Sequence, residues 1–568
     1  ARVTAEYTRP ADAAAHYYLG LALAAQQRFD EAYDQFYRAS WDAAFHTAAI
    51  LQVAGISCRR GEFALALEQV RDALRTGAWN TKALGLEAAL LRRLGRTKEA
   101  AVVAARALEI DPLDFLAANE RDLARTRPAR RASSRSDRRS LEVRMRDEVE
   151  SYLELATDYL QWGLWDEAMD VLRRPVEARL PFASSYPLVH YYLGYLEEQK
   201  GAPPRAAAHY AQGAECPVDY CFPFRLETAD VLQAALRMQP NDARAQYYLG
   251  NLYYDLQPEL AMDCWTRARA LDDSLAAAHR NLGWGYYRAR NDLTNAVTCY
   301  ETAIARQARD PRWFLELDQL YELANTDPQR RLALLEQHQS VARRRMESFT
   351  RLIALQVLCG HSGAAIGHLT TNFFAVREGG GEIHDVYVDA HLLRGIERLR
   401  AKDAATALHH FQKASEYPEN LSVGRPKNDR RAAQVGYHVG LAHEALGQTE
   451  AARQSFAAAA AQSGTEGWAE TRFYQALCHQ RLGETEQAAK FFAQLVERGT
   501  RDLAHGESSD FFAKFGEQET RQTRAAAAHY TLGLGYLGQG DRQRARAEFE
   551  QAVRLNRSHV WARHQLAP

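Results

Sequence analysis

The chain has 568 residues, of which 46% are hydrophobic and 25% are charged, and this composition is ordinary for a folded protein in water. Its net charge of −1 argues against a dedicated nucleic-acid-binding protein. No apolar run approaches the roughly 18 residues of a membrane-spanning helix and no signal segment is visible, so we expect a cytoplasmic location and no membrane contact.

A recurring spacing of small and aromatic residues runs along the chain. In its first copy, Gly20 is followed by Ala32, Phe36 and Ala39. The same template, in some copies with Ala for the first Gly or with a slip of one residue, starts again at Ala88, Ala156, Gly194, Gly250, Gly283, Gly395, Gly440, Ala476 and Gly533. Small residues at these offsets let two helices cross closely, and a glycine between them ends the first helix.

This template resembles the tetratricopeptide repeat, a helix–turn–helix of about 34 residues. The resemblance implies an all-α fold, an α-solenoid (superhelix) of about 13 tetratricopeptide-like repeats with inserted loops. One repeat cannot bury its apolar face alone, and stacked neighbours can.

The chain divides into three parts along its length. Residues 1–112 form an N-terminal repeat block, residues 113–147 an Arg-rich linker, and residues 148–568 the main solenoid. The main solenoid carries non-repeat insertions near 214–230, 372–388, 416–432 and 497–523. The first residue is Ala rather than Met, which is consistent with a fragment or a processed product of a longer protein.

The linker is the one strongly basic stretch. Residues 121–146 hold ten Arg against three acidic residues, a balance of +7, and contain no aromatic residue. We interpret the stretch as a solvated connection. The alternative is a patch for phosphate or an acidic partner, although nucleic-acid binding by base stacking would need aromatic side chains.

The sequence contains a literal G-x-G-x-x-G at Gly533, Gly535 and Gly538. A dinucleotide-binding loop would need a buried strand before it, and the preceding "TRAAAAHY" favours a helix instead. We therefore interpret Gly533 as the helix-crossing glycine of the last repeat and expect no cofactor.

Two other segments hold residues that could carry chemistry. Cys216 and Cys221 are close enough for a disulfide or metal site, but the seven cysteines include no CxxC pair, and we expect reduced core thiols. The segment "EGGGEIHDVYVDAH" gathers six potential metal or acid–base groups: Glu378, Glu382, His384, Asp385, Asp389 and His391. It lacks an HExxH register, so we predict no metal site and no catalytic residues in this chain.

The inner surface of the solenoid is the predicted binding site. In such repeats the first helix of each pair lines this surface, and aromatic and Arg side chains dominate binding hot spots. The predicted groove residues are Tyr191, Tyr195, Arg244, Tyr247, Asn251, Tyr254, Asp255, Arg280, Trp284, Tyr287 and Arg288. The alternative is that several of these tyrosines only pack between helices.

Segments such as "NFFAVREGGGEIHDVYVDAHLLRG" and "SEYPENLSVGRP" are more particular than the generic repeat. With them, residues 148–568 resemble the C-terminal repeat half of bacterial proteins that carry a domain of unknown function, family 5107. The resemblance implies an accessory or scaffold half beside a domain that resembles a carbohydrate-processing β-sandwich. It provides no catalytic residues for this part of the chain.

We therefore expect a non-catalytic scaffold that binds a protein or peptide through its groove and inserted loops. The partner could be its own N-terminal domain or a second copy of the chain. The alternative is the accessory half of a glycan-acting enzyme, in which loop 376–391 completes the active site and groove tyrosines stack on sugars.

Overall fold

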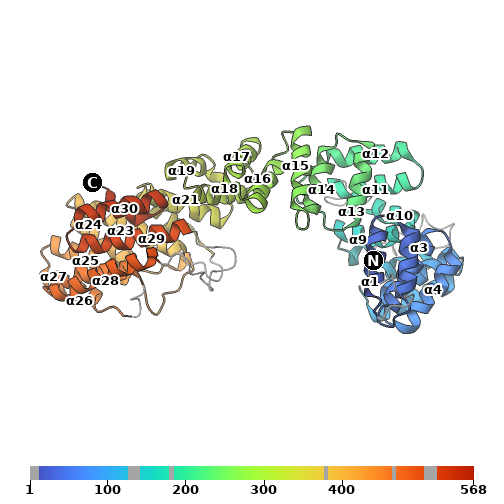
Figure 1. The fold of residues 1–568 in the computed structure, drawn as a ribbon, viewed down its shortest axis with the longest axis horizontal. Coiled ribbons are helices and arrows are strands. Elements are labelled where there is room, and N and C mark those ends of the chain that lie inside the picture. Colours follow the sequence, from blue (N-terminus) through green and yellow to red (C-terminus); the bar gives the residue numbers. More distant parts are fainter. Residues whose placement is uncertain are drawn as a thin grey trace. The chain divides into compact units, whose positions relative to one another are not determined.

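The computed structural model describes residues 12–125, 141–146, 148–177, 185–375, 382–463, 468–504 and 521–567. Within these ranges the regular structure is helical throughout, and no strand occurs (Figure 1). The chain separates into two compact units, residues 1–278 and 279–568, which are described one at a time. The predicted all-α solenoid is confirmed.

Unit 1 is a series of antiparallel helix pairs with two unpaired helices. The pairs are α1 (Ala14–Ala25) with α2 (Phe29–Ala39), α3 (His46–Arg59) with α4 (Phe63–Thr76), α5 (Thr81–Arg93) with α6 (Thr97–Ile110), α9 (Val149–Gln161) with α10 (Trp165–Glu177), α11 (Pro187–Gln199) with α12 (Pro203–Glu215), and α14 (Ala243–Tyr253) with α15 (Pro258–Leu271). The unpaired helices are α7 (Phe115–Arg125) and α13 (Glu227–Met238).

Unit 2 begins within α16 (Ala276–Arg290) and continues the pairs. They are α16 with α17 (Leu293–Arg306), α18 (Pro311–Leu323) with α19 (Pro328–Gln337), α21 (Met346–Leu358) with α22 (Ser362–Thr371), α23 (Glu382–Arg400) with α24 (Ala404–Lys413), α25 (Ala432–Ala445) with α26 (Thr449–Ala460), α27 (Ala469–Leu482) with α28 (Thr485–Ala504), and α29 (Arg521–Gly538) with α30 (Arg542–Leu555). The short elements are α20 (Gln339–Ala342), η3 (Glu419–Leu421) and the last helix described, α31 (Val560–Leu566).

The template glycines lie where the two helices of a pair cross. A Cβ placed on Gly250 would come within 2.5 Å of the Trp265 indole, and one on Gly440 within 2.4 Å of the Phe456 ring. The aromatic side chain covers the crossing glycine of its own repeat, because a residue without a Cβ leaves room for the ring. The same ring also reaches the next pair, where Phe36 packs with Val53 and Phe456 packs with Cys478.

The turn within each pair also follows the template. Gly201 has φ +70° and Gly540 has φ +83°, and the corresponding position in the first repeat is Gln27 at φ +59°. A left-handed residue at this point lets the chain leave the first helix after its last turn. The three glycines of the G-x-G-x-x-G lie inside α29, where Gly538 packs against Phe492, so the dinucleotide alternative is excluded.

A second contact between the two helices of a pair recurs at the same position relative to the crossing glycine. His16 Nδ1 lies 2.7 Å from Gln35 Oε1, and His529 Nδ1 lies 2.6 Å from Glu548 Oε2. In each case the histidine precedes the crossing glycine by four residues. This polar pair satisfies a group that would otherwise be buried without a partner, and the repeat analysis missed it.

The structure adds detail to the predicted division of the chain. Residues 115–125 form α7, inside the segment 113–147 that was predicted as a linker, and residues 126–140 lie outside the described residues. Helix α28 extends to Ala504 and α29 starts at Arg521, so both helices enter the insertion predicted at 497–523. The three-part division remains a prediction. Among the described residues, no helix combines the length and the apolar character needed to cross a bilayer.

Candidate functional site

The first helices of the early repeats of unit 1 form one face, which we call first-helix face 1 (α3, α5 and α7). This face is covered by the pair α9–α10 of the same unit. Trp162, directly after α9, packs against Gly55 of α3, and Arg59 Nη1 donates to the Leu160 carbonyl at 3.1 Å. Lys82 Nζ of α5 lies 2.8 Å from Asp158 Oδ1. First-helix face 1 is therefore covered by residues of its own unit, and none of the predicted groove residues lies on it.

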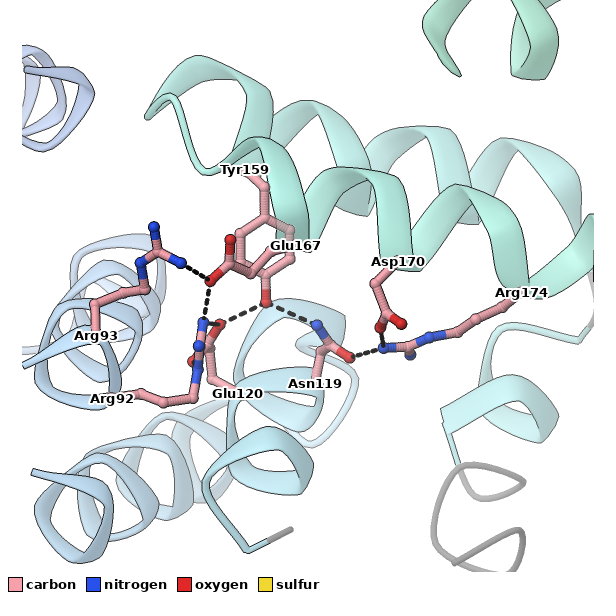
Figure 2. Close-up of polar contacts among 8 residues, drawn as sticks. All are labelled: Arg92, Arg93, Asn119, Glu120, Tyr159, Glu167, Asp170 and Arg174. Atoms are coloured by element: carbon pink, nitrogen blue, oxygen red, sulfur yellow. Dashed lines mark hydrogen bonds and ion pairs between the residues drawn. The ribbon is translucent and has the colours of Figure 1, made fainter. Parts of the chain in front are cut away.

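A buried polar network holds α9–α10 on first-helix face 1, as Figure 2 shows. Arg92 donates to Glu120 at 2.7 Å and to Glu167 at 2.9 Å. Tyr159 donates its hydroxyl to Glu120 at 2.7 Å and accepts from Asn119 at 2.8 Å. Burial disfavours the charged Arg92 guanidinium, but Glu120 and Glu167 outweigh that effect and raise its pKa.

The predicted groove residues of α11 are mostly internal. Tyr191 is fully buried and donates its hydroxyl to Asp242 Oδ2 at 2.8 Å, which fixes it between α11 and the start of α14. Burial, followed by the Asp242 carboxylate, raises the Tyr191 pKa well above its ordinary value. Tyr195 is buried beside Arg59. These two side chains pack between helices, as the alternative interpretation allowed.

The predicted residues on α14 are held by neighbours of the same unit. Tyr247 is buried against the Tyr248 ring, and Asn251 Oδ1 accepts from Trp265 Nε1 at 3.0 Å. The Tyr254 ring lies 5.3 Å from that of Trp265. Arg244 Nε donates to the Cys216 carbonyl at 3.0 Å. Asp255, directly after these residues, is exposed.

The predicted residues of unit 2 form a compact aromatic and cationic patch, which we call the α16 patch (Arg280, Trp284, Tyr287 and Arg288). The Trp284 indole is half-buried, with the Arg280 guanidinium 5.5 Å and the Arg288 guanidinium 5.6 Å from its centroid. The Tyr287 ring lies 6.0 Å away. Glu316 orients Arg280 through two hydrogen bonds, one of 2.9 Å, and Arg288 is exposed.

The insertion predicted at 214–230 lies between α12 and α13, but sequence reasoning missed that its residues alternate between the interior and solvent. Cys221, Pro223 and Arg225 point inward, and Arg225 Nε donates to Glu154 at 2.8 Å while its Nη1 donates to Glu150 at 2.6 Å. The outward residues are 63–87% exposed, and we call them the apolar strap: Tyr220, Phe222, Phe224 and Leu226. The signal was present in the alternation of "DYCFPFRL", which predicts an extended segment with one apolar face.

The acidic and histidine segment does not form a loop around a site. Residues from Glu382 onward are helical in α23, because acidic Glu382 and Asp385 suit the first turn of a helix. His384 Nε2 lies 2.9 Å from the Glu416 carbonyl, and Asp389 accepts from Trp561 Nε1 at 2.9 Å. The expectation that residues 376–391 form an active-site loop is therefore wrong for residues 382–391, which are helical. Residues 376–381, with Glu378, lie outside the described residues.

The structure also places the cysteines and the remaining candidate ligands. All seven cysteines lie in the described residues and none forms a disulfide; burial raises the pKa of the Cys221 thiol to about 12. In the described ranges, no three His, Cys, Asp or Glu side chains are grouped as a metal site would require.

The first helices of unit 2 form a second face, first-helix face 2 (α21, α23, α25, α27 and α29), whose successive members contact one another. The α31 segment (Asn556–Leu566) lies against it. Besides the Trp561–Asp389 hydrogen bond, the ring of His559 lies 4.4 Å from that of Tyr530 on α29. Trp561 and Ala562 are buried, and no residue from Ser558 to Leu566 is exposed.

Comparisons with known proteins agree with the repeat geometry. Models described as tetratricopeptide repeat match residues 1–44, 153–219, 229–261, 470–498 and 526–559. The chain contains tetratricopeptide repeats. Together with the crossing glycines and left-handed turns, these matches identify the helix pairs within the matched residues as repeats of this kind.

Solved structures with similar folds include three proteins of known architecture. The APC/C hetero-tetramer Cut9–Hcn1 is 13% identical, with 96% of this chain and 94% of that chain covered and a TM-score of 0.24. Yeast Tom70 is 14% identical over 77% of this chain and 96% of that chain, with a TM-score of 0.21. YrrB, described as a TPR protein with an unusual peptide-binding site, is 16% identical over 42% and 92%, with a TM-score of 0.15. Similarity at this level concerns the fold alone.

Proposed function

We propose that this chain is a non-catalytic scaffold that binds a partner protein. The observation that carries the proposal is the apolar strap. Four large apolar side chains face solvent on a segment whose alternate residues are pinned by burial and by the Arg225–Glu150 and Arg225–Glu154 ion pairs. A contiguous exposed apolar surface of this kind is typical of a protein–protein contact, because covering it removes apolar area from water.

The α16 patch supports the same function from unit 2. A half-buried Trp flanked by two guanidinium groups combines a large apolar area with polar handles, which is the composition of a binding hot spot. Arg280 is already paired with Glu316, and the exposed Arg288 guanidinium favours a partner segment with acidic side chains. We therefore propose Trp284, Tyr287 and Arg288 as contact residues in unit 2. In unit 1 we propose Asp255, which is exposed just after α14, as a further contact residue.

The experiment compares proteins that copurify with the wild-type chain and with the double variant Phe222→Ser and Phe224→Ser. The control is Leu256→Ser, which removes an isolated side chain that is 84% exposed outside the strap. We expect the strap variant to lose at least one specific partner that both the wild type and the control retain. An identical set of partners for all three proteins would contradict the proposal.

The accessory-half role remains the second candidate, because residues 148–568 resemble the repeat half of family 5107 proteins. It predicts that a glycan binds the α16 patch through Trp284 and Tyr287, whose rings can stack on sugars. A glycan array probed with the wild type and with Trp284→Ala separates the two roles, since only the accessory role predicts a signal that the substitution removes.

A further inference from the structure

The α31 segment fills the face on which a solenoid of this kind would hold a ligand. It meets the elements of unit 2 at points far apart in the sequence. Arg331 Nη1 of α19 donates to Ser558 Oγ at 2.6 Å, and Trp561 Nε1 donates to Asp389 Oδ1 of α23 at 2.9 Å. Arg431, which directly precedes α25, places its guanidinium 5.6 Å from the Trp561 centroid. Within this seven-residue helix Trp561 and Ala562 are buried and the other residues are partly exposed. The helix packs against α30 of the last repeat and also reaches elements that are far from it in the sequence.

Few side-chain hydrogen bonds join the α31 segment to the rest of unit 2. The turn before α31 is fixed by Asn325, whose Nδ2 donates to the Arg554 carbonyl and whose Oδ1 accepts from the Arg557 amide, both at 2.7 Å. Beyond that turn, Ser558 and Trp561 each make a single side-chain hydrogen bond to the rest of the unit. A helix of seven residues is also too short to be stable by itself, so its structure depends on the surface that it contacts.

The groups that Ser558 and Trp561 contact do not depend on α31 for their own order. Arg331 is held by Asp318 through hydrogen bonds of 2.8 and 3.0 Å, and Asp318 is held in turn by Arg351. Burial disfavours the Asp318 carboxylate, but the two guanidinium groups outweigh that effect and lower its pKa. Asp389 is paired with Arg431. The receptor surface is therefore preorganised by its own ion pairs, as a binding site requires.

The chemistry of the segment defines what the surface accepts. Residues 551–568 contain three Arg, two His and one Trp but no acidic residue. The buried indole supplies the anchor and its N–H meets a carboxylate, while Glu470 lies close enough to His559 to act on its charge. A short helix with one Trp, whose indole N–H can donate to Asp389, therefore suits this face.

We propose that first-helix face 2 is a binding site for a short helix that carries a tryptophan, that α31 occupies this site in the resting chain, and that a partner helix with a tryptophan at the same place replaces it. The proposal rests on the scaffold function, and it adds a site distinct from the apolar strap and the α16 patch. Binding at this face then requires release of α31, so the apparent affinity of a partner is its intrinsic affinity multiplied by the fraction of chains in which the face is open.

The test uses a fluorescein-labelled synthetic peptide of residues 551–568 and measures its binding by fluorescence anisotropy. The receptors are the full chain and a chain that ends at Leu555, whose helix content is checked by circular dichroism. We expect the shortened chain to bind the peptide at least tenfold more tightly than the full chain does. A peptide with Trp561→Ala should bind the shortened chain at least tenfold more weakly than the unmodified peptide.

Two receptor variants locate the site. Asp389→Asn in the shortened chain should weaken peptide binding at least threefold, whereas the matched control Asp502→Asn, an exposed carboxylate of α28, should not. If the shortened chain does not fold, the full chain with Trp561→Ala takes its place, since its α31 has lost the anchor and should expose the face.

The proposal is overturned if a folded receptor lacking α31 or its anchor fails to bind the peptide, or if it binds no more tightly than the wild-type chain. These substitutions leave the strap and the α16 patch intact. If the receptor lacking α31 does not bind the peptide, but the strap variant loses a partner, this inference alone is contradicted. If the receptor binds the peptide, but the strap variant keeps all its partners, the strap is contradicted as the partner site.

Discussion

The two units bury the same kind of surface in different ways. In unit 1, first-helix face 1 is covered by a complete helix pair, α9–α10, which is held by a buried network of charges around Arg92 and Glu120. In unit 2, first-helix face 2 is covered by the short helix α31. Its segment is held by the buried Trp561, by the His559 ring against Tyr530, and by hydrogen bonds to Arg331, Asp389 and Asn325, without a buried ion pair of its own among the described residues. The difference shows that one repeat architecture can use its inner face either as permanent core or as an occupied site.

The consequence for function follows from the cost of opening each face. Separating α9–α10 from face 1 would leave buried charges without partners, and that cost makes the contact part of the folded core. Separating α31 from face 2 exposes one Trp and leaves the ion pairs of Asp318 and Asp389 in place. The predictions below test this contrast in order of decreasing effect.

The largest effect should come from Glu120→Ala in unit 1. The substitution removes the carboxylate that accepts from both Arg92 and Tyr159 and leaves a buried guanidinium short of a partner. Breaking a buried ion pair costs about 3–5 kcal/mol, so the free energy of opening of α9, measured by amide hydrogen exchange, should fall by that amount. Glu99→Ala removes an exposed pair with Arg96 and should leave α9 unchanged. A small effect of Glu120→Ala would show that α9–α10 is not locked on face 1.

Trp561→Ala should have a comparable cost that is confined to α31. Truncating a buried Trp costs about 3–5 kcal/mol, more than a seven-residue helix with few other contacts can offset. We expect α31 to lose its protection against hydrogen exchange while α25 and α29 keep theirs. Trp79→Ala, which removes a side chain that is 78% exposed, is the control. Loss of protection throughout unit 2 would mean that α31 is part of the core, like α9–α10.

The crossing glycines should behave alike in both units. Gly250→Ala in unit 1 and Gly440→Ala in unit 2 each force a Cβ against an aromatic ring, and overpacking of this kind costs about 1–3 kcal/mol. Gly367→Ala, in α22 with no atom within 4 Å of the added Cβ, should be neutral or slightly stabilising because Ala favours a helix. Urea unfolding followed by circular dichroism measures all three. Equal effects of Gly440→Ala and Gly367→Ala would contradict the crossing role.

The smallest expected effect is the pH dependence of the stability of unit 2, to which the buried His438 contributes. Burial lowers the pKa of this imidazole to about 4, and the nearby His564 on α31 also has a pKa of about 4. The folded chain therefore keeps these groups neutral at pH values where the unfolded chain is protonated, so stability is complete above pH 6.5 and falls as the pH drops toward 4. Each group contributes a slope of up to about 1.4 kcal/mol per pH unit in this window.

His438→Gln should remove part of that slope. The measurement is the free energy of unfolding of unit 2 at pH 7.0 and 5.0 for wild type and variant, with His443→Gln, whose side chain is more exposed, as the control. A difference between pH 7.0 and 5.0 that is the same in wild type and His438→Gln would show that His438 is not held neutral.

The repeat part of the fold could be predicted because its signal is local. A crossing glycine, a left-handed turn residue and an aromatic side chain recur at fixed offsets within one helix pair, and each has a steric reason. The placement of that aromatic ring over its own glycine follows from a Cβ clearance that spacing alone does not provide, and the ring also packs against the next pair.

The contacts that define the two faces could not be predicted in the same way. Trp162 on Gly55 and Trp561 on Asp389 join residues that are far apart and have no periodic relation. Their partners are decided by how many repeats lie between them and how the repeats curve. The aromatic positions of α11 were predicted as groove residues from their register, but Tyr191 is buried because Asp242 offers its hydroxyl an internal acceptor.

The most direct test of the contrast between the two faces is amide hydrogen exchange on the unmodified chain, followed by mass spectrometry of peptides that cover α9 and α31. The account predicts that α31 exchanges through a local opening at least a hundredfold faster than α9, while α23 and α25 beneath it stay protected. If α31 exchanges as slowly as α9, first-helix face 2 is as permanently covered as face 1, and the account of a replaceable occupant is contradicted.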